Sequence, residues 1–282
     1  MGTGAAGSAT TVRLSSSCVS SQDDDLALAL RLADIADAIT VPRFKATDLQ
    51  VETKPDLTPV SESDKAAELA IRAELESARP GDLVVGEEFG GSEQDRASAR
   101  AWIIDPIDGT KSYVRGVPTW STLIALEVAG EPSVAVVSMP AVGRRWWATR
   151  GGGAFAATGS QAGGERIHVS KIANLADAQL GWSGIEDWDA CGWGDRALAL
   201  ARSVWRSRGI GDAWQYMLVA EGAFEIATDP EATLWDLAAP RLVVEEAGGR
   251  FTSLAGEQTA GGGSGLATNG IVHDAARALL AP

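Results

Sequence analysis

The chain of 282 residues is long enough to bury a large core, in one domain or in two lobes. Its hydrophobic fraction of 45% and charged fraction of 22% are those of an ordinary globular protein, and no uninterrupted apolar stretch approaches the roughly 20 residues of a membrane span. The formal net charge of −14 argues against nucleic acid or an anionic membrane as a partner, and it implies that an anionic substrate would need local help from metal ions.

The N-terminal part divides into a segment of small residues and a first helix. Residues 1–22 are Ser-rich and contain no acidic residue, which predicts a disordered leader. The alternative, a remnant of a targeting peptide, is disfavoured because the segment lacks a hydrophobic region for secretion and carries a single Arg. Leu28, Leu32 and Ile35 then recur at helical spacing behind a run of aspartates, so a helix is predicted from residue 23.

A second helix is predicted after a short β-like stretch at residues 49–54. Ser61 and Asp64 have the spacing of a capping box, which marks the start of the helix. Pro80 and Gly81 follow the last turn and mark its end.

The remaining segments predict a succession of short strands and two further helices. Two of the strands, "LVVG" and "AWIID", run directly into acidic residues. The strands are expected near residues 83–86, 101–105, 122–140 (a pair), 144–156 (with a glycine break) and 224–228, and the helices near 212–224 and 236–249. Helices first, then meandering strands, then alternating elements predict a layered α+β architecture with two sheets.

Acidic residues at strand ends are the most informative feature of the sequence. Glu87 and Glu88 follow "LVVG", Asp105 and Asp108 follow "WII", and Asp236 follows "ATLW" and opens a helix. Side chains at the carboxyl ends of buried strands converge on one rim of a sheet. Hard oxygen ligands of this kind suit Mg²⁺, which takes a few carboxylates and completes its shell with water and substrate phosphate.

The loop "DPIDGT" at residues 105–110 carries the strongest signal. Pro106 stiffens the turn, Gly109 lets the backbone approach a ligand, and Thr110 supplies a hydroxyl at a helix N-terminus, where exposed N–H groups bind phosphate oxygens. A buried apolar run that enters two acids has no cheap structural explanation. Taken alone, "GEE" is more often a solvated turn and "WD" a helix start.

Histidine and cysteine chemistry is disfavoured by number and spacing. His168 and His273 sit among no other ligand types, which argues against a zinc site or a Ser–His–Asp hydrolase. Cys18 and Cys191 lie far apart and form neither a disulfide framework nor a CxxC pair, so a reducing cytoplasm is the expected location. The chemistry is therefore expected to depend on carboxylates, hydroxyls and bound cations.

Together, "WIIDPIDGT", the upstream "GEE" and the downstream "WDLAA…EEAGG" resemble the inositol monophosphatase superfamily of magnesium-dependent, lithium-sensitive phosphatases. The resemblance implies the αβαβα-type layered fold of sugar phosphatases, with one phosphatase domain over residues 23–282. Its metal-motif lobe would span about 23–150 and its substrate lobe about 151–282. Segments such as "KPDLTPVSESDKAAE", "GEEFG", "RGVPTWSTLIAL", "RRWWATRGGGAF" and "GIGDAWQYMLVAEG" are similar, more narrowly, to the bacterial histidinol-phosphatase branch.

The resemblance also implies two to three Mg²⁺ ions and their ligands. Asp105, Asp108 and Asp236 would hold one ion. Glu87, Asp105 and the Ile107 carbonyl would hold another. The ions would neutralise the phosphate and lower the pKa of a bound water.

Catalytic and binding roles follow from the same resemblance. Asp64 would orient waters around a third, weakly held ion, and Glu87 with Thr110 would orient and deprotonate the water that attacks phosphorus in line. Gly109 and Thr110 would offer amides to the phosphate. The substrate-binding set expected on this basis is Asp108, Gly109, Thr110, Asp212, Asp229 and Asp236.

Substrate choice should depend on groups outside the metal site. Histidinol phosphate carries an amine and an imidazole, so Asp212 and Asp229 are candidates for contacts with it. Two alternatives stay open: Asp212 also fits a helix N-cap, and related inositol phosphatases place an acid at the position of Asp229 to bind sugar hydroxyls. Lys54 and Lys111 are candidates for contacts with phosphate or a carboxylate, but solvation at the surface is the more ordinary interpretation for both.

The predicted reaction is hydrolysis of L-histidinol phosphate, a small phosphorylated substrate of histidine biosynthesis, to L-histidinol and phosphate. The same chemistry on an inositol phosphate, fructose bisphosphate or nucleotide 3′-phosphate is the alternative. A remote alternative is that the chain is a non-catalytic relative that only binds metal. The intact ligand set argues against it. Two departures from the family leave substrate preference open: Ser112 and Tyr113 replace Asn-Phe, and Pro240 interrupts the helix after Asp236.

Assembly is the last expectation. Proteins that resemble this chain are commonly dimers, so a homodimer is predicted. Trp182, Trp188 and Trp193 lie close together in the sequence. Core packing or a dimer contact is the expected role of this Trp-rich stretch, and stacking on substrate is the less favoured alternative.

Overall fold

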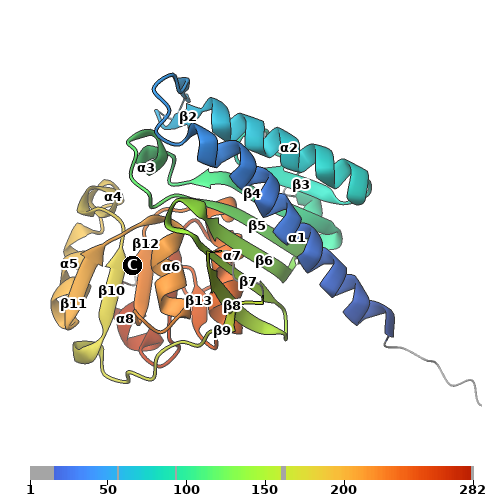
Figure 1. Ribbon diagram of the computed structural model, residues 1–282. Helices are drawn as coiled ribbons and strands as arrows, with labels where there is room; N and C mark the ends of the chain where they lie inside the picture. Colours follow the sequence, from blue (N-terminus) through green and yellow to red (C-terminus); the bar gives the residue numbers. More distant parts are fainter. Residues whose placement is uncertain (1–15, 56, 93, 160–162, 281–282) are drawn as a thin grey trace, which may run out of the picture.

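The computed structural model describes residues 16–55, 57–92, 94–159 and 163–280 of the chain. Two β-sheets alternate with three layers of helices (Figure 1), so the expectation of an αβαβα-type layered fold is confirmed. Residues 1–15 of the predicted leader lie outside the described residues. The first helix begins at Ser16 rather than at residue 23, so residues 16–22 of the predicted leader are helical.

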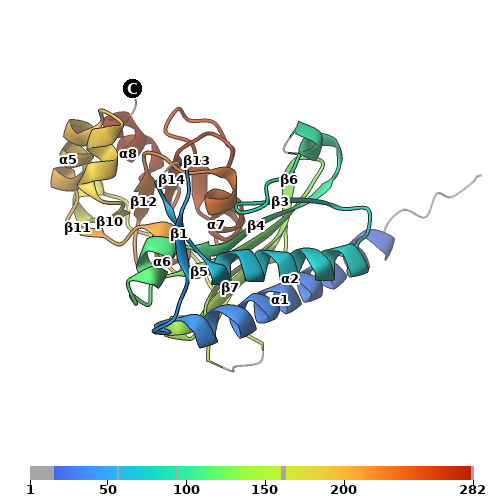
Figure 2. The same cartoon turned by 90° about the horizontal axis from the view of Figure 1, so that it is seen from above.

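Two long helices cover one face of the larger sheet. Helix α1 (Ser16–Arg43) and helix α2 (Glu62–Ala78) lie side by side across it (Figure 2), and they bury leucine, isoleucine and alanine side chains against its strands. A small hairpin of β1 (Val51–Thr53) and β2 (Pro59–Ser61) leads into α2. None of the helices within the described ranges combines the length and the apolar character that a membrane span requires.

The larger sheet has seven strands in the order β3-β4-β5-β6-β7-β8-β9. The β3–β4 pair is parallel and the others are antiparallel. The strands are β3 (Leu83–Gly86), β4 (Arg100–Asp108), β5 (Ser121–Val128), β6 (Glu131–Met139), β7 (Arg144–Thr149), β8 (Gly153–Thr158) and β9 (Glu165–Arg166). The predicted glycine break separates β7 from β8, so the proposed lobe boundary near residue 150 falls inside this sheet.

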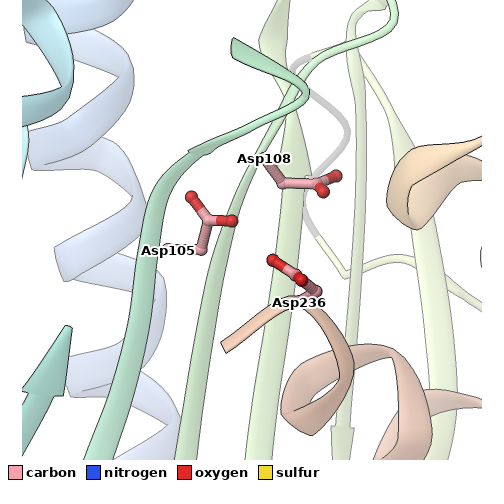
Figure 3. A group of neighbouring side chains, drawn as sticks. All are labelled: Asp105, Asp108 and Asp236. Carbon is pink, nitrogen blue, oxygen red and sulfur yellow. The ribbon is translucent and has the colours of Figure 1, made fainter. Parts of the chain in front are cut away.

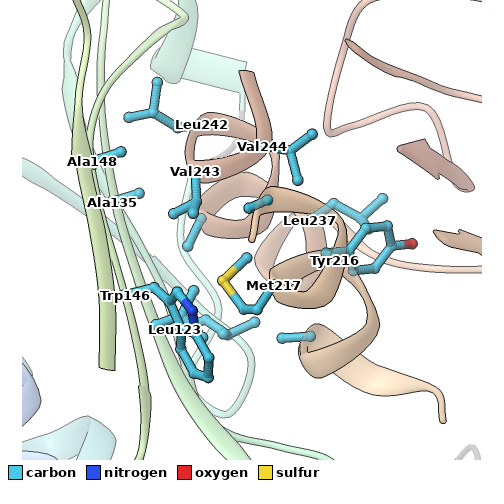
Figure 4. Packing of buried hydrophobic residues seen from close by; sticks show 14 of the residues in the cluster. Leu123, Ala135, Trp146, Ala148, Tyr216, Met217, Leu237, Leu242, Val243 and Val244 are labelled. Atoms are coloured by element: carbon cyan, nitrogen blue, oxygen red, sulfur yellow. The ribbon is translucent and has the colours of Figure 1, made fainter. Parts of the chain in front are cut away.

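Two helices form the layer between the sheets. Helix α6 (Asp212–Ala220) and helix α7 (Leu234–Glu246) bury apolar side chains against both sheets, and Figure 4 shows Met217 of α6 beside Trp146 of the larger sheet. Helix α7 continues through Pro240, so the predicted interruption of this helix is wrong.

The smaller sheet has five strands in the order β11-β10-β12-β14-β13. They are β10 (Gln179–Trp182), β11 (Arg206–Gly209), β12 (Ile226–Asp229), β13 (Arg250–Thr252) and β14 (Gly265–Thr268). Its outer face is covered by α4 (Ile185–Ala190), α5 (Gly194–Ser203) and α8 (His273–Leu280). Trp188 is fully buried in this outer core and Trp182 and Trp193 pack against it, so the Trp-rich stretch serves core packing.

Short helical segments complete the chain: α3 (Thr110–Val114), η1 (Gln94–Ser98), η2 (Pro140–Val142) and η3 (Leu175–Asp177). Tyr113 in α3, one of the two departures from the family motif, is fully buried against Phe44 and Trp120. Its hydroxyl donates a hydrogen bond to the Thr40 carbonyl at 2.8 Å. This departure therefore joins α3 to α1 through a small aromatic core.

Candidate active site

The loop at the end of β4 places two aspartates at one edge of the larger sheet. The pairing of β4 with β5 shifts register between Asp105 and Asp108, which is the signature of a β-bulge. Pro106 sits in this irregular stretch, where a missing N–H costs no regular ladder bond, and its carbonyl accepts a hydrogen bond from Thr122 at 2.9 Å. Asp105 Oδ1 accepts the Ile107 N–H at 3.0 Å, which holds the carboxylate against its own loop.

Gly109 and Thr110 turn the chain from the strand into α3. Gly109 has a φ of 80°, and a Cβ at this position would lie 2.8 Å from Asp212 Oδ2, so both backbone and space require glycine. Thr110 Oγ1 lies 3.0 Å from the Ile107 carbonyl oxygen and 3.1 Å from Asp64 Oδ1. Because a hydroxyl carries one proton, it donates to one of these acceptors at a time.

Two further acids reach the site from capping boxes at helix starts. Asp64 Oδ2 accepts the Ser61 N–H at 2.8 Å at the start of α2, as the spacing of these residues predicted. Asp236 Oδ2 accepts the Thr233 N–H at 2.7 Å at the start of α7. In both cases one carboxylate oxygen holds the helix end. The second oxygen of Asp64 lies beside the Thr110 hydroxyl, and Asp64 does not itself line the cavity in the described structure.

Three of the predicted ligands converge. Asp105, Asp108 and Asp236 each present an oxygen within 4.8 Å of the others (Figure 3). Burial raises the pKa of all three carboxyls, and the negative charges of Glu87, Asp108 and Asp236 raise that of Asp105 further. Buried, mutually repelling oxygen donors fit a hard divalent cation, which would relieve the repulsion.

Glu87 and Glu88 follow β3 as predicted, and Lys54 bridges them. Lys54 Nζ donates to each carboxylate at 2.7 Å. Burial acts to lower the pKa of Lys54, but hydrogen bonds to the two glutamates and their charge outweigh it and raise the pKa. Burial raises the pKa of Glu88 to about 7, against the opposing hydrogen bond from Lys54. The interpretation of Lys54 as a solvated surface lysine is therefore wrong, whereas the side chain of Lys111 is exposed.

Asp212 lies at the start of α6, close to Gly109. The N-cap of α6 is Gly211 and no side chain caps this helix, so the N-cap alternative for Asp212 is wrong. Asp212 has a left-handed φ of 51°, which Asp tolerates better than most residues. Burial and the charge of Asp236 raise its pKa to about 6, while Lys111 acts to lower it.

Asp229 lies apart from this group. It is buried at the end of β12, where its Oδ2 accepts hydrogen bonds from Gln215 Nε2 and the Tyr216 hydroxyl, each at 2.6 Å. Burial raises its pKa to about 7. The described structure does not bring Asp229 to the wall of the cavity, so its contact with substrate stays a prediction.

A cavity of about 510 Å³ connects these groups. The predicted residues that line it are Lys54, Glu87, Asp105, Ile107, Asp108, Gly109, Thr110, Lys111, Asp212 and Asp236. Sequence reasoning missed Thr58, Pro59, Thr233 and Trp235, which also line it. Trp235 could have been found from the "WD" pair, because it shares a helical turn with the predicted ligand Asp236.

Comparison with known proteins identifies the family of the chain. Residues 21–281 match the model of the inositol monophosphatase family. A histidinol-phosphatase of Streptomyces coelicolor is 53% identical over 255 residues, which cover 89% of this chain and 94% of that protein. A histidinol-phosphatase of Mycobacterium tuberculosis is 54% identical over 251 residues, with coverage of 89% and 95%.

More distant relatives share the fold. An inositol-1-monophosphatase of Rhizobium meliloti is 34% identical over 229 residues, which cover 80% of this chain and 81% of that protein. The solved structure of an inositol monophosphatase from Zymomonas mobilis superimposes with a TM-score of 0.79 at 29% identity, covering 92% of this chain and 98% of that one. With the family model matched over nearly the whole length, the conclusion is that the chain belongs to the inositol monophosphatase family.

Proposed function

We propose that this chain is a Mg²⁺-dependent phosphomonoesterase that hydrolyses L-histidinol phosphate to L-histidinol and inorganic phosphate. The observation that carries the proposal is the convergence of Asp105, Asp108 and Asp236 on one cavity that Glu87 also lines. The two histidinol-phosphatases at 53% and 54% identity, each aligned over most of both chains, support the choice of substrate.

The buried acids are the groups that would hold the metal. Asp105, Asp108 and Asp236 would hold one Mg²⁺ ion, as their convergence supports, and Glu87 with Asp105 and the Ile107 carbonyl would hold a second. Bound ions would supply positive charge to the phosphate and lower the pKa of water. A third ion beside Asp64 belongs to the same proposal.

The protein's own groups orient the reactants. The N–H groups of Gly109 and Thr110, at the start of α3, would donate to phosphate oxygens, which their place on the cavity wall supports. Glu87 and Thr110 line the same cavity, so they are placed to orient a water and to take up its proton during in-line attack on phosphorus. Asp64 holds the Thr110 hydroxyl at 3.1 Å, which limits its rotation.

The alcohol portion of the substrate would meet Asp212 and Trp235. Asp212 offers a carboxylate to the ammonium group, and the partly buried ring of Trp235 offers an apolar wall to the imidazole. Asp229, which Gln215 and Tyr216 hold by hydrogen bonds, remains the second acid proposed to bind the substrate. The second candidate substrate is an inositol monophosphate, because a relative that is 34% identical is an inositol-1-monophosphatase.

We further propose a cytoplasmic homodimer that lithium inhibits. The resemblance to bacterial histidinol-phosphatases supports the location and the assembly. Trp205 is 68% exposed beside the edge strand β11, which leaves an apolar side chain for an interface. Light scattering at micromolar concentration should give the mass of two chains, and a mass of one chain would refute the dimer.

Phosphate release from a substrate panel tests the function. Histidinol phosphate, inositol 1-phosphate, fructose 1,6-bisphosphate and a nucleotide 3′-phosphate are compared with Mg²⁺ and with a chelator. The expected result is the highest kcat/KM for histidinol phosphate and no hydrolysis after chelation. A higher kcat/KM for inositol 1-phosphate would refute histidinol phosphate as the substrate. Activity that survives exhaustive chelation would refute the metal mechanism.

A further inference from the structure

One face of α2 contacts both segments that supply the catalytic groups. Asp64, Glu68 and Arg72 are spaced four residues apart, so they follow one another along this face at steps of about 6 Å. Asp64 accepts the hydrogen bond from Thr110. Glu68 and Arg72 contact the turn that carries Glu87. A single rigid helix therefore spans the distance between the two catalytic segments.

Glu68 is the centre of the second contact. Its side chain is fully buried, and its Oε2 accepts the Glu88 N–H at 2.8 Å. Its Oε1 accepts the Phe89 N–H at 3.3 Å and the Arg72 Nε–H at 2.7 Å. The carboxylate thus satisfies two consecutive backbone donors of the turn directly after Glu87, and Arg72 balances its charge.

The turn is shaped to receive this carboxylate. Gly86 and Gly90 close it with reciprocal backbone hydrogen bonds of 3.1 Å and 3.0 Å, and Arg72 also donates to the Gly90 carbonyl. A Cβ on Gly86 would lie 2.0 Å from Glu68 Oε1, so the acid occupies the space that a side chain at residue 86 would fill. The Glu87 N–H donates to the Ile104 carbonyl at 3.2 Å, which ties the turn to the strand that leads into Asp105.

We propose that Glu68 is a positioning residue for Glu87: by holding the Glu88 and Phe89 amides from α2, it sets where the Glu87 carboxylate lies relative to Asp105 and Thr110. The mechanistic part of this inference rests on the proposed phosphatase function. Glu68 itself does not line the cavity in the described structure, so it acts through the turn and not on the substrate. Its effect on the metal donors can be measured without any turnover.

Glu68→Gln tests the role with little change in volume. An amide has one acceptor oxygen in place of two, so its NH₂ group must face either the Glu88 N–H or the donors on the other side. Two donors that face each other repel, and the turn must shift. Changes in groups that orient metal ligands typically cost about 10- to 100-fold in metal affinity or activity.

Glu127→Gln is the matched control. Glu127 is also a buried acid paired with an arginine, Arg96 at 2.6 Å, but it lies at the end of β5 remote from the cavity. Both variants are measured as full-length protein by calorimetric titration with Mg²⁺, by thermal unfolding, and by kcat and KM on a generic aryl phosphate. The aryl phosphate keeps the outcome independent of the identity of the natural substrate.

The expected result is that Glu68→Gln weakens Mg²⁺ binding and lowers kcat by about tenfold or more with KM changed less, whereas Glu127→Gln lowers only the melting temperature. Equal Mg²⁺ affinity and kcat in the two variants would overturn the proposal, because Glu68 would then serve stability alone. Should Glu68→Gln fail to fold, Glu68→Asp, which keeps the charge but shortens the reach, carries the same test. A wild-type protein that binds no Mg²⁺ would instead refute the proposed function.

Discussion

Buried acids have opposite surroundings at the two ends of β4 and β5. Away from the cavity, Asp25 accepts charged hydrogen bonds from Arg79 and Arg100, and Glu127 pairs with Arg96. At the cavity end, the charges that act most strongly on Asp105 are those of other acids. The acids are buried at both ends, and the source of the countercharge differs.

This difference separates structural acids from functional ones. A buried carboxylate needs compensation, and an arginine from the same chain supplies it permanently. Where the chain brings acids together and supplies no basic side chain to balance their negative charge, the site gains affinity for a cation. Asp212 extends the series, because its expected countercharge is the ammonium group of the substrate.

The largest expected effect comes from removing one acid of the converging group. Asp108→Asn should raise the barrier to hydrolysis by at least about 3 kcal/mol, or more than 100-fold in kcat/KM, because charge and metal occupancy are both lost. Steady-state kinetics at saturating Mg²⁺ measure it, with Glu127→Gln as the control from the other end of the sheet. Unchanged turnover would remove Asp108 from the site.

The next effect concerns Asp212, the acid proposed to contact the ammonium group of the substrate. Asp212→Asn should raise KM for histidinol phosphate by roughly 10- to 100-fold, since a charge-assisted contact contributes about 1.5–3 kcal/mol. Hydrolysis of an aryl phosphate, which has no amine, should change little. Equal losses on both substrates would mean that Asp212 supports the metal donors.

Substitutions at the two ends should differ in their effect on stability. Asp25→Asn should destabilise the protein by about 1–2 kcal/mol, because it weakens hydrogen bonds to two arginines that are each about a third exposed. Asp105→Asn should leave the metal-free protein equally stable or more stable, because it relieves repulsion and an amide oxygen can still accept the Ile107 N–H. Chemical denaturation in the presence of a chelator measures both, and equal destabilisation would contradict the comparison.

The last prediction concerns a slope of stability with pH in the metal-free protein. The pKa of Asp229 is raised from 3.8 to about 7, so between these values the folded state holds a proton that the unfolded state lacks. Stability should therefore fall as pH rises through this window and level off above it. Asp229→Asn should reduce the fall of the melting temperature between about pH 5 and 8, to which Glu88 and Asp212 also contribute, and Asp274→Asn, at an exposed position, should leave it unchanged. An unchanged slope in the Asp229 variant would assign it to other groups, such as Glu88 with a pKa of about 7.

Features that depend on residues close together in the sequence were predicted correctly. The capping box of Ser61 and Asp64, the strand that enters "DPIDGT", and the short helix at Thr110 all depend on residues a few positions apart. The convergence of the acids was predicted from their places at strand ends, and the resemblance to a family supplied the pairing of ligands with ions.

Features that depend on long-range packing were missed or misread. Lys54 and Glu87 are 33 residues apart, and no local pattern shows that a lysine beside a hairpin bridges two glutamates. Asp212 had the residue type of an N-cap, but Gly211 takes that position and turns the carboxylate toward Gly109. Glu68 was not singled out from the sequence, because its partners come from a turn some twenty residues away.

The two capping boxes have a consequence for the dynamics of the site. Asp64 and Asp236 each use one oxygen to hold the first turn of a helix, so fraying of either helix end would also release a carboxylate from the site. A cation held by the second oxygen would then slow hydrogen exchange at the Ser61 and Thr233 amides, which lie far from the aspartate loop in sequence. Opening of a helix end and loss of a site oxygen are, in this protein, one motion.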